Sequence, residues 1–176
     1  MSDSHMTSSP KLLDPRGRLV LERIALTPRP ALHALQAGTV LFYDNEKMNV
    51  GHYGLIFERI KAGLRERGIA HFQDRRAGIR GKTPADIAAM ARDLRALNVT
   101  AAVIALADMG VRPAMVALTV EMEKLGIPTV CLTAEPGSQL CVAHAHYRAG
   151  ALCLISFDIY PPSPADAVGA QAQACV

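Results

Sequence analysis

The sequence predicts an α/β domain: a three-layer, doubly wound arrangement around a mostly parallel five-stranded sheet. Short apolar runs alternate with amphipathic segments, and glycines or prolines separate them. The apolar runs are hydrophobic nearly throughout, which is typical of strands covered by helices on both faces. Half of the residues are hydrophobic but only 5% are aromatic, so we expect an aliphatic core.

The clearest boundary between elements is the start of a helix at Thr83. Thr83 can cap the helix, Pro84 suits its first position, and Asp86 completes an approximate capping box. The predicted strands cover residues 39–43, 69–73, 101–106, 127–133 and 152–157, and the predicted helices cover residues 51–68, 83–97, 113–125 and 136–148. Right-handed crossovers between them favour the flavodoxin-like strand order 2-1-3-4-5.

The chain divides into three parts on composition. We interpret residues 1–37 as an N-terminal arm whose first six residues resemble a cloning tag, residues 38–166 as the α/β domain, and residues 167–176 as a flexible tail or short helix. The net charge of +3 is scattered among acidic residues, which argues against nucleic-acid binding. We expect no membrane span or signal peptide, and therefore a cytoplasmic protein with reduced cysteines.

The carboxyl ends of the strands are the expected place for a ligand. In open parallel sheets, ligands bind where the strand order reverses, which here lies between the first and third predicted strands. The loop after the first strand is unusually polar, although its first two residues could simply turn the chain and cap the next helix. Its candidate residues are Asp44, Lys47 and His52 as catalytic groups, and Asn45 and Asn49 as substrate-binding groups.

The loop after the third predicted strand adds a second set of candidates. Gly110 allows close approach of a ligand to the backbone, and the following helix offers free N–H groups to an anion. Arg112 stands at that helix start, where a cation opposes the helix dipole. An anionic ligand explains this placement, and a solvent-exposed arginine is the alternative. We expect Asp108 to be catalytic and Met109, Gly110, Arg112 and Glu135 to contact the substrate.

Neither a metal nor a cofactor is expected. His144 and His146 are two residues apart and point in different directions on a helix, and Cys141 with His144 supplies too few ligands for a structural zinc. The sequence contains no phosphate-binding loop, no dinucleotide fingerprint and no nucleophile elbow.

The loop motifs resemble the UGSC family of (seleno)proteins, which is related to component B of glycine, sarcosine and betaine reductases. The resemblance rests on residues 13–15 (LDP), the DNxKxN pattern of residues 44–49 and the ExEKxGIP pattern of residues 121–128. The family uses a selenocysteine or cysteine followed by Gly-Ser-Cys after the third strand. By this resemblance, Met109 stands in place of the nucleophile and Arg112 in place of the resolving thiol. A thioether cannot form a thiolate, so the resemblance implies the fold and the pocket without the redox chemistry.

These observations favour a UGSC-like enzyme or enzyme-complex component, with lyase-like or hydrolase-like chemistry on a small anionic organic substrate. Cys131 is a candidate replacement nucleophile, and a buried core thiol is the alternative. Two other functions stay open. The chain could be the non-catalytic partner of a cysteine-bearing paralogous subunit, or a small-molecule-binding domain. A homo-oligomer is also compatible with the sequence.

Overall fold

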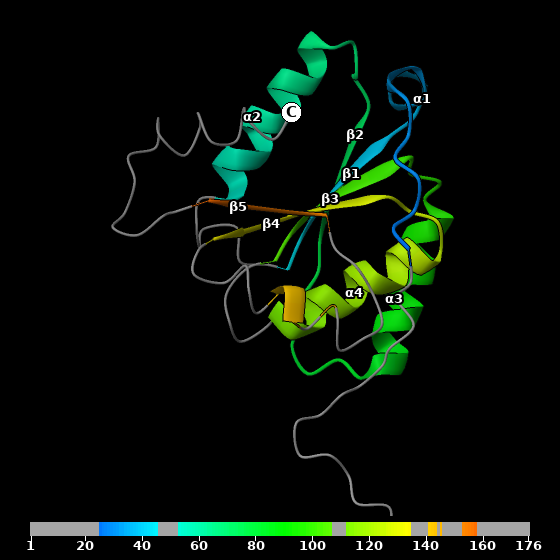
Figure 1. Cartoon of the computed structure of the whole chain (residues 1–176), viewed down its shortest axis with the longest axis vertical. Helices are drawn as coiled ribbons and strands as arrows, with labels where there is room; N and C mark the ends of the chain where they lie inside the picture. Colours follow the sequence, from blue (N-terminus) through cyan, green and yellow to red (C-terminus); the bar gives the residue numbers. More distant parts are fainter. Residues whose placement is uncertain are drawn as a thin grey trace, which may run out of the picture.

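The five strands form one parallel sheet with helices on both faces (Figure 1). The structure, a computed structural model, describes residues 25–45, 53–106, 112–134, 141–143, 145 and 153–157. The elements are α1 (Leu32–Ala37), β1 (Val40–Asp44), α2 (Tyr53–Glu66), β2 (Phe72–Arg76), α3 (Pro84–Ala96), β3 (Ala101–Ala105), α4 (Arg112–Lys124), β4 (Thr129–Ala134) and β5 (Leu154–Phe157). The strand order is β2-β1-β3-β4-β5, which confirms the predicted order.

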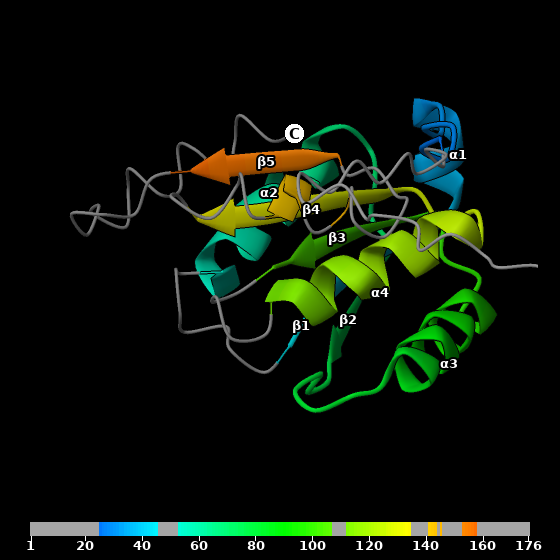
Figure 2. The same ribbon diagram turned by 60° about the horizontal axis from the view of Figure 1, so that its bottom comes forward.

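The sheet separates two hydrophobic layers. Helices α3 and α4 lie on one face and α2 lies on the other (Figures 1 and 2). Successive residues of β1 point to opposite faces, so Val40 and Phe42 belong to the α2 layer while Leu41 and Tyr43 belong to the α3–α4 layer. All four side chains are buried, which explains the continuous apolar run in the sequence.

The second strand is displaced from its prediction. It spans Phe72–Arg76 rather than residues 69–73, and Arg75 and Arg76 pair with Tyr43 and Asp44 of β1. As the edge strand it exposes its last three residues, so it lacks the apolar pattern of a buried strand. Arg75 and Arg76, which follow the predicted strand, are therefore part of the strand itself.

Lys61 of α2 is buried, although the charge of its side chain predicts an exposed position. Its Nζ lies 2.9 Å from Glu58 Oε1 and 2.8 Å from Asp74 Oδ1, and 5.0 Å from the centre of the Phe42 ring. Burial alone lowers the pKa of Lys61, but the bonds to the two carboxylates outweigh it and raise that pKa. This buried ammonium thus ties α2 to the edge strand.

The predicted capping box of α3 is confirmed. Thr83 Oγ1 accepts a hydrogen bond from the Asp86 N–H, and the Thr83 N–H donates to the Asp86 carboxylate. The following helix, α4, begins at Arg112 and ends before Gly126, whose φ of 77° favours glycine. Of the predicted helix 136–148, residues 141–143 and 145 are helical, and the other residues lie outside the described part.

A short helix, α1, precedes the sheet and was not predicted, because Pro28 and Pro30 suggested an irregular arm. The chain before α1 is held by Glu123 of α4. The Glu123 carboxylate accepts hydrogen bonds from the Thr27 N–H (2.8 Å) and Arg29 Nη1 (2.9 Å). It also accepts bonds from the N–H (2.7 Å) and hydroxyl (2.6 Å) of Thr129. One carboxylate therefore joins the arm, α4 and β4.

None of the described helices has the length and apolar character that crossing a membrane requires.

Candidate functional site

The candidate site lies where β1 and β3 end, because the strand order reverses between these two strands. Asp44 is the last residue of β1 and Asn45 follows it, while Arg112 is the first residue of α4. The carboxyl ends of the strands and the first turn of α4 lie at the same edge of the molecule (Figure 2). The structure therefore places Arg112, from the loop after the third predicted strand, at the same edge as Asp44 and Asn45, from the loop after the first.

Three predicted site residues are buried at this edge. Asp44 is 2% exposed, Asn45 is 4% exposed and Arg112 is 6% exposed. Charged side chains are rarely buried this deeply in proteins unless they meet a specific partner. The alternative in which Arg112 is a solvent-exposed arginine is therefore wrong.

Asn45 differs from its neighbours in its hydrogen bonding. Neither Nδ2 nor Oδ1 of Asn45 has a hydrogen-bond partner within the described ranges, although both atoms are buried. Leaving a buried amide without partners costs about 1–3 kcal/mol. A ligand that both donates and accepts hydrogen bonds would satisfy this side chain.

Asp44 is linked to the edge strand by an ion pair. Arg76 Nε lies 3.5 Å from Asp44 Oδ2, and the Arg76 side chain is 56% exposed while that of Asp44 is 3% exposed. The exposed guanidinium of Arg76 therefore places a positive charge next to the buried carboxylate of Asp44. Arg76 was not predicted as a site residue, because its strand lies at the edge of the sheet and lacks an apolar pattern.

Two buried residues make contacts with the end of β4 at this edge. Tyr53, the first residue of α2, is buried and its hydroxyl donates to the Leu132 carbonyl oxygen at 3.4 Å. Cys141 is also buried, and its Sγ lies 3.8 Å from Thr133 Oγ1. These contacts connect the elements that flank the predicted loops.

Seven predicted site residues lie outside the described part of the chain. They are Lys47, Asn49, His52, Asp108, Met109, Gly110 and Glu135. Their roles stay predictions.

Cys131 is unsuited to act as a nucleophile. It lies within β4, is fully buried, and its Sγ is 3.6 Å from the hydroxyl of Thr119. Burial raises the pKa of the Cys131 thiol to about 12. At neutral pH the thiol therefore stays protonated, so the alternative of a core thiol describes Cys131 better.

The buried carboxylate at the opposite edge of the sheet behaves differently from Asn45. Burial alone raises the pKa of Glu123, but the hydrogen bonds from Thr129, Arg29 and Thr27 outweigh it and hold that pKa below its ordinary value. Its hydrogen-bonding capacity is met within the protein. Glu123 is therefore a structural residue, whereas the unsatisfied amide of Asn45 points to a ligand.

Comparisons with known proteins give no relative for this chain: no protein-family model, curated protein or solved structure matches it. Within the described ranges, no group of three or more His, Cys, Asp or Glu side chains is arranged to hold a metal ion.

Proposed function

We propose that this chain is a UGSC-like enzyme, or a component of a heteromeric enzyme, that binds a small organic anion at the carboxyl edge of β1 and β3. The proposal is carried by one observation. Asp44, Asn45 and Arg112 are all buried at the edge where the strand order reverses, and the Asn45 amide has no hydrogen-bond partner among the described residues. Buried polar groups at this edge of a parallel sheet are typical of ligand sites.

Arg112 supplies the charge that selects an anion. Arg112 is the first residue of α4. The free N–H groups and the dipole at the start of a helix also attract negative charge. A carboxylate can accept two parallel hydrogen bonds from a guanidinium. Asn45 would bind a neighbouring hydroxyl, amine or carbonyl of the same molecule, since its amide both donates and accepts.

The chemistry we propose is proton transfer rather than thiol redox exchange. Asp44 is a buried carboxylate at the same edge of the sheet, and Asp108, His52 and Lys47 are further acid–base candidates from the sequence. Met109 has no ionisable proton, and the thiol of Cys131 is buried with a raised pKa. A lyase-like or hydrolase-like step fits these groups better than a thiolate attack does.

Calorimetric titration of the purified chain with acetate, glycolate, oxalate, succinate and inorganic phosphate tests this proposal. We expect at least one carboxylate to bind, and Arg112→Met to weaken that binding by roughly 100-fold because a charge-assisted contact is lost. Binding is measured at a temperature at which circular dichroism shows Arg112→Met to be folded, because the substitution also removes an interaction that Arg112 makes within the protein.

Arg95→Met is the matched control, because Arg95 is exposed at the end of α3, at the opposite edge of the sheet. Its affinity for the anion should equal that of the wild type. Equal losses of anion affinity in Arg112→Met and Arg95→Met, or no binding of any anion in the panel, would contradict the proposal. Turnover by the purified chain that disappears in Asp108→Ala would support an enzyme active alone, and binding without turnover would favour a component of a heteromeric enzyme.

A further inference from the structure

Positive charge is concentrated in the basic segment, residues 75–82, which covers the end of β2 and the loop that joins β2 to α3 (Figure 2). The segment carries four cationic side chains and no acidic one, whereas the net charge of the whole chain is +3. The four are Arg75, Arg76, Arg80 and Lys82, and all of these residues are exposed. Like charges that are gathered in this way attract anions to the surface around them.

The basic segment is held against the end of β1. The Ala77 N–H donates to the backbone oxygen of Asp44, and the Tyr43 hydroxyl donates to the Ala77 carbonyl oxygen, both at 3.1 Å. Ile79 is 1% exposed and belongs to the core between the sheet and helices α3 and α4. A hydrogen bond of 3.2 Å from the Lys82 N–H to the Ile79 carbonyl oxygen closes the loop. The position of these charges is therefore fixed by the fold.

The basic segment and Arg112 lie on opposite sides of the end of β1. In the sheet, β1 lies between β2, which leads into the basic segment, and β3, which precedes the helix that Arg112 begins. Asp44 is opposite Arg76 in the register of β1 and β2, and Asn45 is the next residue. The ends of β2 and β3 are two strand spacings, about 10 Å, apart. A small molecule that binds at Asn45 can therefore meet positive charge on both sides.

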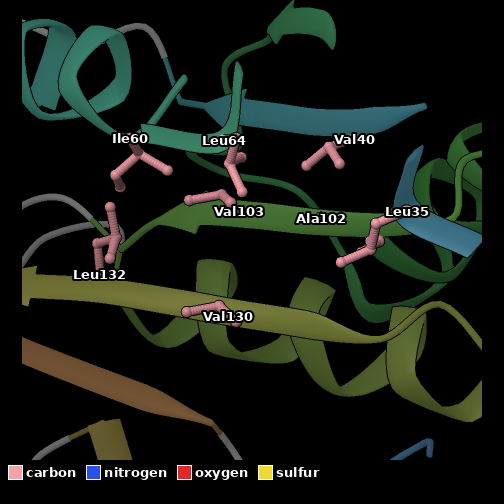
Figure 3. Close-up of a pocket in the computed structure, with 9 residues that line it drawn as sticks. Leu35, Val40, Ile60, Leu64, Ala102, Val103, Val130 and Leu132 are labelled. Atoms are coloured by element: carbon pink, nitrogen blue, oxygen red, sulfur yellow. The ribbon is translucent and has the colours of Figure 1, made fainter. Parts of the chain in front are cut away.

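The apolar cavity on the α2 face of the sheet gives no alternative place for a charged group. It has a volume of about 210 Å³, and the nine residues that line it are all aliphatic (Figure 3). A charged group in this cavity would lose its hydration without gaining a side-chain partner. A second negative charge on a ligand of the anion site would therefore be bound by the basic segment.

We propose that the ligand of the anion site carries a second anionic group, a carboxylate or a phosphate, which binds to the basic segment. This inference rests on the function proposed above, and it narrows the substrate class from a small organic anion to a small dianion. Arg112 and Asn45 bind one end of the dianion, and the basic segment binds the other end.

Arg75 and Arg80 are the residues of the basic segment that we assign to the second group. Arg76 pairs with Asp44, whereas neither Arg75 nor Arg80 pairs with an acidic side chain in the part of the chain that the structure describes. A guanidinium presents a planar fork of N–H donors that fits carboxylate and phosphate oxygens equally. Because Arg75 and Arg80 are exposed, salt should weaken their contacts with an anion.

Calorimetric titration with matched pairs of acids tests the second charge. Succinate, glutarate and adipate are compared with butyrate, valerate and hexanoate, which have the same chain lengths but one carboxylate each. In low salt, at least one diacid should bind about 10-fold more tightly than its matched monoacid, and added sodium chloride should reduce this gain. The double variant Arg75→Gln/Arg80→Gln should lose most of the gain and keep the monoacid affinity of the wild type.

The identity of the second group follows from 3-phosphonopropionate, in which a phosphonate replaces one carboxylate of succinate. A gain larger than that of succinate would assign the second group as a phosphate, and a smaller gain would assign it as a carboxylate.

The matched control is Arg59→Gln/Arg92→Gln, which removes two exposed arginines from α2 and α3 and changes the net charge equally. This variant should keep the gain. Diacids that bind no more tightly than their matched monoacids, or equal losses of the gain in the two double variants, would overturn the inference. Monoacid binding that still depends on Arg112 would then leave the anion site itself standing. If the wild type bound none of these acids, the anion site and the inference would both be wrong.

Discussion

Replacing Glu123 with Gln is expected to destabilise the fold by about 3 kcal/mol, because it breaks a buried charged hydrogen-bond network. The carboxylate accepts four hydrogen bonds, from Thr27, Arg29 and both donors of Thr129. A glutamine amide would direct its NH₂ group at some of these donors. Thermal unfolding should show a melting temperature lower by roughly 10 °C.

Glu121→Gln provides the matched control on the same helix. Glu121 is partly exposed and forms a surface ion pair with Lys124 at 2.7 Å, and pairs of this kind contribute little. Its melting temperature should stay close to that of the wild type. If Glu121→Gln and Glu123→Gln had the same melting temperature, Glu123 would not be the residue that joins the arm to α4 and β4.

The pH dependence of unfolding follows from the lowered pKa of Glu123. A carboxyl group with a lowered folded-state pKa contributes stability that is fully present above its ordinary value of 4.5. This contribution is lost as the pH falls through the lower folded-state pKa. The difference in unfolding free energy between wild type and Glu123→Gln should therefore be constant near neutral pH and shrink in acid.

Gly38→Ala is expected to destabilise the fold by about 3 kcal/mol through a steric clash. A Cβ atom at Gly38 would overlap with Thr100 Oγ1 and would lie 2.9 Å from the backbone oxygen of Ala34. The φ of Gly38 is −108°, which any residue adopts, so the clash alone produces the loss. Chemical denaturation should give a lower midpoint with an unchanged slope.

Two further variants separate the clash from backbone strain. Adding Thr100→Ala to Gly38→Ala removes the nearest atom and should recover part of the lost stability. Gly81→Ala meets no atom within 4 Å but has a φ of 75°, so it should cost only about 1 kcal/mol. A Gly38→Ala protein as stable as the wild type would show that the junction of α1, β1 and β3 is looser than these distances indicate.

The fold was predictable from the sequence where apolar periodicity reflects burial. The strands β1 and β3 and most of β4 are buried and appear as continuous apolar runs, and the capping box of α3 is a local signal. The edge strand β2 could not be placed correctly, because its exposed side chains are polar. Lys61 was misjudged for a related reason, since its partner Asp74 belongs to that strand.

The position of the candidate site was predictable from the sequence, but the ion pairs and hydrogen bonds of its residues were not. The polar residues after the first strand and the arginine at a helix start pointed to the carboxyl edge. The ion pair of Arg76 with Asp44 and the bond from Tyr53 to Leu132 join residues far apart in the sequence, and no local pattern encodes them. Burial of Arg112 likewise depends on packing that composition does not reveal.

A nitrogen-edited NMR titration that follows the side-chain NH₂ groups of asparagine tests the central claim most directly. Asn45 is buried at the carboxyl edge, and Asn98 is exposed at the end of α3, so one spectrum contains both the reporter and its control. With the tightest carboxylate of the calorimetric panel, the Asn45 resonances should shift and saturate at the calorimetric affinity while those of Asn98 stay in place. Saturable binding that leaves the Asn45 resonances unmoved would contradict an anion site at this edge.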